Sequence, residues 1–192
     1  MSLTTYELLH GVPIGAEYAV DATELDKEDI PQARVDAVMD ILRKSDDREE
    51  HFLAARLLCS WGYHEGLAAL EKGMAEPEGL EGFITHRLHG CDDTYNHVQL
   101  AVLRYFADLA DRGEVEEARR QVYAPLSRVI ALAANRRFEI SAILEFIRRE
   151  GFLEYMPSIE QYFLEIIKQP EIFHWKIAEA ANFFASLRRS GG

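Results

Sequence analysis

The sequence predicts an all-α protein built as a short stack of antiparallel helix hairpins, without β-sheet. Apolar residues recur at the i, i+3, i+4 spacing of one helix face over most of the chain. No segment alternates with a period of two for long enough to form a strand. Gly62, Gly113 and Gly151 each follow a helical run directly, where a left-handed residue ends a helix. We therefore expect a turn into the next helix at each of these glycines.

The first two predicted helices follow Pro31 and Asp47. The Asp47 side chain is placed to accept hydrogen bonds from the first backbone amides of the second helix. The apolar faces of the two helices are Val35, Val38, Met39 and Leu42, then Leu53, Leu57, Leu58 and Trp61. Gly62 is expected to end the second helix and to turn the chain into a third.

A long loop is predicted from Ala75 to Asp93, because prolines and glycines interrupt any helix there: Pro77, Gly79, Gly82 and Gly90. The helix that follows has an apolar face made of Val98, Val102, Tyr105, Phe106 and Leu109. Its opposite side is also apolar, at Leu100, Ala101 and Leu103. We therefore expect this helix to be buried on two sides.

Two prolines and two further apolar faces define the C-terminal helices. Pro125 lies inside a helical run from Val115 to Ala134 and removes a backbone donor, so we expect that helix to kink or split. Pro170 introduces the last helix near its first turn. The two apolar faces are Ile159, Tyr162, Phe163, Ile166 and Ile167, then Phe173, Ile177, Ala180, Ala181, Phe184 and Leu187.

A short internal repeat surrounds the turn glycines. Residues 62–71 and 151–160 share the pattern glycine, aromatic, any residue, glutamate, any residue, apolar, two spacers, apolar, glutamate. Gly113 keeps the glycine and the following helix but lacks the aromatic. The three glycines lie 51 and 38 residues apart, which suits helix-pair repeats of roughly 40 residues with one insertion. The equivalent buried positions that this alignment predicts are Leu58, Leu109 and Ile147.

On these hairpins, residues 33–187 resemble the HEAT-like and armadillo-like α-helical repeat proteins. The resemblance implies a short curved stack, an α solenoid, whose faces bind other macromolecules. Unequal repeat lengths and the loop insertion depart from the family pattern, and a plain helical bundle is the alternative. We expect one domain over residues 1–192, made of an acidic N-terminal segment (1–30), first helix pairs (33–75), a loop insertion (76–93) and further hairpins (94–192).

Acidic residues are concentrated in the first half of the chain. The formal net charge is -12, and residues 1–96 hold 20 acids and 8 bases whereas residues 97–192 hold 13 of each. Such a field repels nucleic-acid phosphates and anionic membrane surfaces, so we expect neither as a partner. Two acidic clusters instead predict a surface that binds another protein with a basic surface. The predicted partner-binding residues are Asp21, Glu24, Asp26, Glu28, Asp29, Asp46, Asp47, Glu49 and Glu50, and each is expected to be exposed.

The two cysteines, Cys59 and Cys91, are too few for the dense disulfide framework of small secreted proteins. Glu7 and Glu17 lie where a signal peptide would be uncharged. No apolar run approaches the roughly 18 residues of a membrane-spanning helix. We therefore expect a cytoplasmic protein in which Cys59, among apolar neighbours, is a buried thiol.

Four residues carry side chains that suit zinc: His86, His89, Cys91 and His97. The paired spacings that fix ligand geometry, C-x2-C or H-x3-H, are absent, so we predict no bound metal. The chain also has no G-x-S-x-G elbow, no phosphate-binding loop and no dinucleotide glycine pattern. We therefore expect no catalytic residue, no cofactor and no enzymatic activity.

Protein binding without catalysis is the function that these observations predict. A small, acidic, cytoplasmic helical protein fits the bacterial immunity proteins, which block a toxin's active site by charge and shape. That hypothesis follows from charge and fold class, since the chain has no diagnostic motif. Two alternatives stay open: a helical scaffold or regulatory adaptor that binds a helix in its groove, and a metal-dependent hydrolase centred on residues 86–97.

Overall fold

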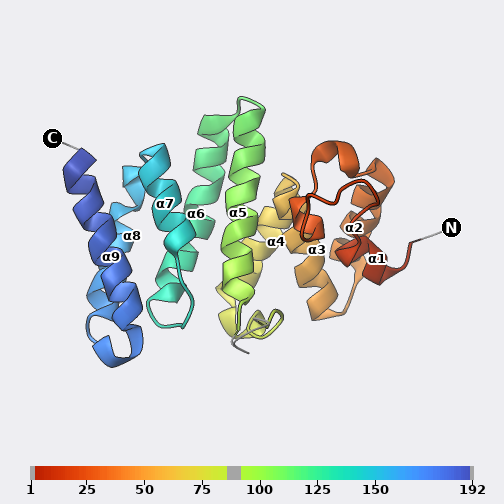
Figure 1. The fold of residues 1–192 in the computed structure, drawn as a ribbon. Coiled ribbons are helices and arrows are strands. Elements are labelled where there is room, and N and C mark those ends of the chain that lie inside the picture. The colour runs from red at the N-terminus through yellow and green to blue at the C-terminus, as the bar shows by residue number, and fades with distance from the viewer. Residues whose placement is uncertain (1–2, 86–91, 191–192) are drawn as a thin grey trace. The chain divides into compact units, whose positions relative to one another are not determined.

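The structure is a computed structural model that describes residues 3–85 and 92–190, and it consists of helices and connecting loops (Figure 1). The described residues form no strand, and an isolated β-bridge joins Thr85 to Asp92. This confirms the predicted all-α fold for that part of the chain. The α-helices are α1 (Thr5–His10), α2 (Gln32–Lys44), α3 (Arg48–Ser60), α4 (His64–Ala75), α5 (Thr94–Asp111), α6 (Val115–Ala133), α7 (Ser141–Glu150), α8 (Met156–Ile166) and α9 (Pro170–Ser190). Short 3-10 helices are η1 (Ala22–Glu24), η2 (Lys27–Asp29), η3 (Pro77–Gly79) and η4 (Leu153–Tyr155).

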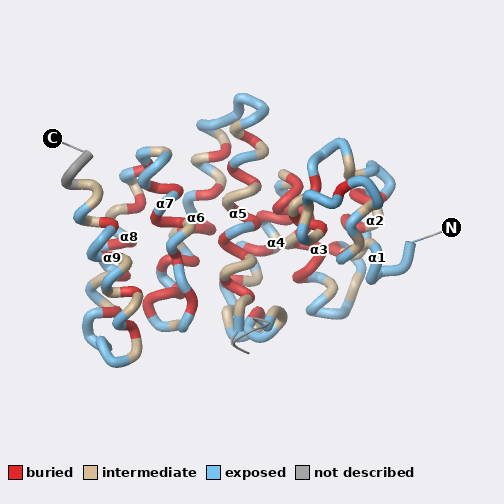
Figure 2. Tube along the Cα trace, viewed as in Figure 1, coloured by how far each residue is buried: buried red, intermediate tan, exposed pale blue. Residues whose placement is uncertain are grey.

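The first of two compact units, Met1–Val122, is built around α3. This helix contacts α1, α2, α4, α5 and η1. All of its residues from Phe52 to Ser60 are buried except Arg56, which is half-buried, and Figure 2 shows buried stretches along the helix. A helix that is apolar on nearly every side is stable only when other elements surround it. The sequence Phe52–Ser60 therefore places α3 at the centre of this unit.

The N-terminal segment, residues 11–31, lies over α3 and carries η1 and η2 (Figure 1). A buried hydrogen bond attaches it, because the Trp61 indole nitrogen donates to the carbonyl oxygen of Ala22 at 2.8 Å. Arg34 on α2 lies over the Trp61 ring, 5.4 Å from its centre, and donates to the carbonyl oxygen of Leu8 at 2.8 Å. Trp61 and Arg34 together hold the segment and α1 in place.

The second unit, Tyr123–Gly192, packs α7 and α8 against α9. The division between the units falls inside α6. Apolar residues at helical spacing on the three helices are buried in the second unit, among them Ile143, Ile147, Tyr162, Ile166 and Phe173. Tyr162, Ile166 and Phe173 belong to the apolar faces that the sequence predicts. The predicted face of α9 is wrong in part, since Ala181 is exposed whereas Phe183 is buried.

A lysine is fully buried among these apolar residues. The Lys176 ammonium donates to the carbonyl oxygen of Ala133 at 2.6 Å and to that of Arg136. These carbonyls belong to the C-terminal end of α6 and the turn after it, where helix geometry leaves acceptors without partners. The rings of Phe138, Tyr162 and Phe173 lie with their centres 4.8 to 6.0 Å from the same nitrogen. Lys176 therefore caps α6 from another helix.

The three turn glycines have the left-handed backbone that the sequence predicts, with φ of +80° at Gly62, +82° at Gly113 and +70° at Gly151. Each hairpin closes with the same backbone hydrogen bond. The N–H of the residue after the glycine donates to the carbonyl of the residue four positions before it: Tyr63 to Leu58 (2.8 Å), Glu114 to Leu109 (2.9 Å) and Phe152 to Ile147 (3.1 Å). This six-to-one bond is the Schellman cap, so the three turns share one backbone hydrogen-bond pattern.

Replacing Gly62 by alanine is expected to destabilise the protein more than the same change at Gly113 or Gly151. A Cβ at Gly62 would lie 1.9 Å from the Asp108 carboxylate, whereas a Cβ at Gly113 or Gly151 meets no atom within 4 Å. The strain of a left-handed alanine, about 1–2 kcal/mol, applies to all three variants. In urea unfolding, Gly62→Ala should therefore have the lowest free energy of unfolding of the three variants. Adding Asp108→Ala to it should recover part of the extra loss. Equal losses in the three single variants would contradict the close approach.

Three details of the helices differ from the sequence prediction. α6 does not split at Pro125, because proline removes one hydrogen bond while the buried side chains on either side of it hold the helix. The second apolar side of α5 is buried only in part, since Ala101 is buried whereas Leu100 is 42% exposed. Ile167 lies past the end of α8 and is exposed. Apolar identity predicted burial at these last two positions, and the packing leaves both in solvent.

Candidate functional site

The nine predicted partner-binding carboxylates lie in two places, both in the first unit. Five are on the N-terminal segment from Asp21 to Asp29, and four surround the N-terminus of α3 from Asp46 to Glu50. The expectation that all nine are exposed is wrong for four of them. Four of the carboxylates are half-buried: Asp21, Glu24, Asp29 and Glu50. The other five are exposed: Asp26, Glu28, Asp46, Asp47 and Glu49.

Asp21 and Glu24 pair with arginines of the helices beneath the segment. The Asp21 carboxylate lies 2.8 Å from Arg56 on α3, and the Glu24 carboxylate lies 2.7 Å from Arg104 on α5. Burial by itself would raise the pKa of Asp21, but hydrogen bonds from Thr23 and the charge of Arg56 outweigh it and lower that pKa. These two carboxylates therefore fasten the segment to the core.

The second acidic cluster also has members with structural roles. Asp47 caps α3, since its carboxylate accepts the backbone N–H groups of Glu49 at 2.8 Å and Glu50 at 3.0 Å. Glu50 accepts a hydrogen bond from the Ser45 hydroxyl at 2.7 Å. Asp46 and Asp47 also border a groove of about 260 Å³ beside α3 and α4. The groove has an apolar floor of Phe52, Ala55, Leu70, Leu80 and Phe83.

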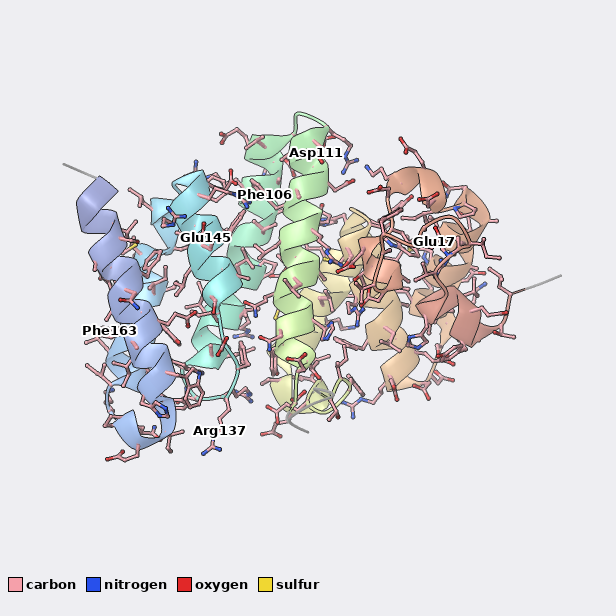
Figure 3. All side chains as sticks on the ribbon, viewed as in Figure 1. Glu17, Phe106, Asp111, Arg137, Glu145 and Phe163 are labelled. Carbon is pink, nitrogen blue, oxygen red and sulfur yellow. The ribbon has the colours of Figure 1, made fainter. Side chains whose placement is uncertain are left out.

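A larger open cleft, about 770 Å³ in volume, lies between the N-terminal segment and the C-terminal ends of α3 and α5. Three exposed carboxylates line it: Asp26, Glu28 and Asp111. Figure 3 labels Asp111 at the end of α5. Each cation lining the cleft is paired, since Arg104 meets Glu24 while Lys27 and Arg112 both meet Asp108. Within the described residues, the three exposed carboxylates have no ion-pair partner. We call this feature the acidic cleft.

Ser60 borders the acidic cleft at the end of α3. The residue is 9% exposed, and its hydroxyl has no hydrogen-bond partner among the described residues. A buried polar group without a partner is unfavourable, by about 1–3 kcal/mol, so such a group is commonly completed by water or by a ligand. Ser60 is therefore a buried polar group in the wall of the acidic cleft.

A second cavity, of about 70 Å³, shares Thr23, Glu24, Ser60 and Arg104 with the acidic cleft. His97 of α5 lines it, and its ring lies 3.4 Å from the Asp93 carboxylate. Burial and the nearby charge of Arg56 lower the pKa of His97. The imidazole is therefore held neutral beside two paired arginines.

The acidic cleft presents groups that bind cations and hydrogen-bond donors. Cys59 beside it is fully buried, and burial raises the pKa of its thiol, which makes it an inert core residue as expected from sequence. No cluster of three metal-ligating side chains occurs in the part of the chain that the structure describes. The predictions for His86, His89 and Cys91 fall outside the described residues.

No family model matches this chain, and no curated protein or solved structure matches it. Its function is therefore inferred from the site itself. In the described residues, every helix is too short or too polar to cross a bilayer.

Sequence reasoning missed three residues that line the acidic cleft: Asp111, Tyr18 and Ser60. A carboxylate near the end of a helix faces the negative end of the helix dipole, so Asp111 in the last turn of α5 is unfavourable there. That signal could have singled out Asp111 as a residue retained for another purpose. Ser60 and Tyr18 carry no comparable signal, because their surroundings depend on segments that are distant in sequence.

Replacing Ser60 by alanine is expected not to lower the free energy of unfolding, because no hydrogen bond is lost and a buried hydroxyl without a partner is removed. Ser45→Ala is the matched control. The Ser45 hydroxyl donates to Glu50 and accepts the Asp47 N–H at 3.2 Å, so this variant should lose about 1 kcal/mol. Urea unfolding of both variants checks the difference. An equal loss in both would show that the Ser60 hydroxyl has a partner in solution.

Proposed function

We propose that this chain is a protein-binding module without enzymatic activity, which binds a basic segment of another protein in the acidic cleft. The observation that carries the proposal is the set of three exposed carboxylates, Asp26, Glu28 and Asp111, that line the cleft without a cation partner in the described residues. Lysine and arginine side chains would pair with these carboxylates.

The specific form we propose is an immunity protein or inhibitor in the bacterial cytoplasm, with a HEAT-like arrangement of helix hairpins. An inhibitor gains from charge because an acidic surface steers a basic toxin and raises its association rate. The net charge of -12 and its concentration in the first half of the chain support this form. The Schellman caps at Gly62, Gly113 and Gly151 support the repeat arrangement.

A scaffold or adaptor role is the second candidate, and the groove beside α3 and α4 favours it. Its apolar floor includes Phe52 and Phe83, whose rings stack with centres 5.3 Å apart. Apolar grooves of this kind accept side chains from one face of an amphipathic helix. Such a partner would contact Asp46 and Asp47 at the rim but would not reach Asp26 or Asp111, which are absent from this groove.

Neutralising the acidic cleft tests the proposal with an oligolysine peptide as the probe. The variant is Asp26→Asn/Glu28→Gln/Asp111→Asn, and the control is Glu71→Gln/Glu160→Gln/Glu171→Gln, which removes the same charge from exposed positions elsewhere. We expect the cleft variant to bind about tenfold more weakly, with a shallower salt dependence, and the control to stay near wild type.

The location of binding is checked by NMR of the two indole N–H signals. Trp61 lines the acidic cleft, whereas Trp175 belongs to the second unit. Oligolysine should shift the Trp61 signal and leave that of Trp175 in place. Equal affinity of the two charge variants, with no movement of Trp61, would contradict the proposal.

A further inference from the structure

Four apolar side chains on the N-terminal segment project into solvent next to the acidic cleft. Ile14 is fully exposed, Val20 is 89% exposed, Tyr18 is 51% exposed and Val12 is 37% exposed. Single exposed apolar residues are common on protein surfaces, but four within nine residues form a concentration of the kind that marks interaction sites. We call residues 12–20 the apolar segment.

The backbone of the apolar segment is held in a defined conformation. Ala16 is fully buried, and its N–H donates to the carbonyl oxygen of Pro13 at 3.1 Å. The N–H of Val20 donates to the Glu24 carboxylate at 2.8 Å, and Glu24 is itself fixed by Arg104. The exposed apolar side chains are thus presented from a fixed backbone, which reduces the entropy that a partner must overcome on binding.

Tyr18 joins the apolar segment to the acidic cleft. Its ring lines the cleft, and its hydroxyl donates to the Asp29 carboxylate at 2.7 Å. The same hydroxyl accepts the backbone N–H of Asp26 at 2.8 Å. An aromatic ring held by a polar tip at the border between an apolar and a charged surface is a common anchor in protein interfaces. The two surfaces are therefore continuous at Tyr18.

We propose that the apolar segment is the second half of the partner-binding surface, and that the partner is a basic amphipathic segment of another protein. Its basic side chains enter the acidic cleft, while its apolar side chains cover Ile14, Tyr18 and Val20. This inference rests on the proposed function and adds the chemistry of the partner. The acidic cleft and the apolar segment should affect different rate constants. Exposed carboxylates chiefly set the association rate, whereas buried apolar contacts chiefly set the dissociation rate.

Charge complementarity favours a basic segment of another protein over a second copy of the chain or an anionic membrane. A second copy of the chain would bring Asp26 and Glu28 close to the same carboxylates of its partner, with a net charge of -12 on each molecule. An anionic membrane is repelled in the same way. Glu17, exposed within the apolar segment (Figure 3), adds a further negative charge that a basic partner would meet.

Two peptides of equal charge separate the apolar contribution from the electrostatic one. One peptide has about 18 residues, or five helical turns, with leucines on one helix face and lysines on the other. The second peptide replaces each leucine by serine. The variant is Ile14→Ser/Val20→Ser, and the control is Leu153→Ser/Leu164→Ser, which changes residues that are 60% and 53% exposed in the second unit. Fluorescence anisotropy measures affinity, and stopped-flow measures both rates.

We expect wild type and the control to bind the lysine–leucine peptide about tenfold more tightly than the lysine–serine peptide, through slower dissociation. Ile14→Ser/Val20→Ser should bind both peptides equally, with an unchanged salt slope and an unchanged melting temperature. An unaltered preference in that variant would overturn the inference while leaving the acidic cleft intact. Failure of both peptides to shift Trp61 would instead overturn the proposed function. A wild-type dimer in sedimentation that the variant abolishes would make a second copy the occupant and overturn the inference.

Discussion

Replacing Leu58, Leu109 or Ile147 by alanine is expected to lower the free energy of unfolding by about 2–5 kcal/mol at each position. Their side chains are 0%, 3% and 0% exposed, so truncation removes buried methyl groups and leaves a cavity. Each residue also accepts the Schellman hydrogen bond of its hairpin through its carbonyl oxygen. The side chain and the carbonyl of one residue thus join core packing to the turn that follows.

The two tryptophans make this prediction measurable unit by unit. Trp61 is in the first unit with Leu58 and Leu109, and Trp175 is in the second with Ile147. Urea unfolding of single-tryptophan backgrounds, Trp61→Phe or Trp175→Phe, reports each unit separately. The matched controls are Leu100→Ala and Leu164→Ala, whose side chains are 42% and 53% exposed and whose loss should be below about 1 kcal/mol.

Losses near zero at two of the three buried positions would contradict the equivalence of the hairpins. A further check is the hydrogen exchange of the Tyr63, Glu114 and Phe152 amides. All three donate the Schellman bond, so all three should be protected in the native protein. Exchange of one of them at the rate of an open loop would show that its hairpin lacks the cap in solution.

The helices were predictable from the sequence because their cause is local. Apolar spacing placed the buried faces of α2, α3 and α5 and most of that of α8, and the cap at Asp47 and the turn at Gly62 followed from side-chain and backbone chemistry over a few residues. On α9 the spacing was less informative, since Ala181 of the predicted face is exposed. α1 was not predicted, although Thr4 and Glu7 form a capping box that sequence alone contains. The capping box is a local signal that can be read from the sequence, whereas the exposure of Leu100 depends on how α5 packs.

The sequence predicted which segment of the candidate site is acidic but not which of its carboxylates are paired with arginines. The sequence indicated which segment is acidic, and Asp26 and Glu28 of that set line the acidic cleft. It did not indicate that Asp21 and Glu24 pair with arginines more than thirty residues away. Charge counting treats all carboxylates alike, but only those that the fold leaves without a cation can attract a partner. Separating the two groups requires knowing which helices the N-terminal segment lies over.

Lys176 shows the same limit, since the apolar face predicted for α9 does not include it, yet the structure buries it completely. The ammonium is fully buried, and burial lowers its pKa from the usual 10.5 to about 8. Glu179 of α9 and Glu139 before α7 act in the opposite direction, and the neighbouring Tyr162 hydroxyl of α8 has its own pKa raised by burial. The charged form of Lys176 is thus less favourable in the folded protein than in the unfolded chain.

The stability of the second unit is therefore expected to rise with pH through Lys176. Between pH 8 and 10.5 the folded protein has lost the proton while the unfolded chain still binds it, which favours folding as pH rises. A pKa lowered from 10.5 to about 8 corresponds to about 3 kcal/mol over this window, and below pH 8 the contribution is absent. The neutral amine can still donate to the carbonyls of Ala133 and Arg136, so the cap of α6 is kept.

Lys176→Met isolates this contribution, because methionine keeps the aliphatic volume and does not titrate. Burial also raises the pKa of Cys59 and Tyr162, which weakens folding at high pH in both proteins, so the measured quantity is the difference between wild type and variant. Urea unfolding followed by Trp175 in a Trp61→Phe background should show wild type gaining about 3 kcal/mol over Lys176→Met between pH 7 and pH 10.5. A difference that stays constant with pH would show that Lys176 keeps its proton throughout. In that case the two carbonyls and three aromatic rings hold the ammonium as firmly as water does.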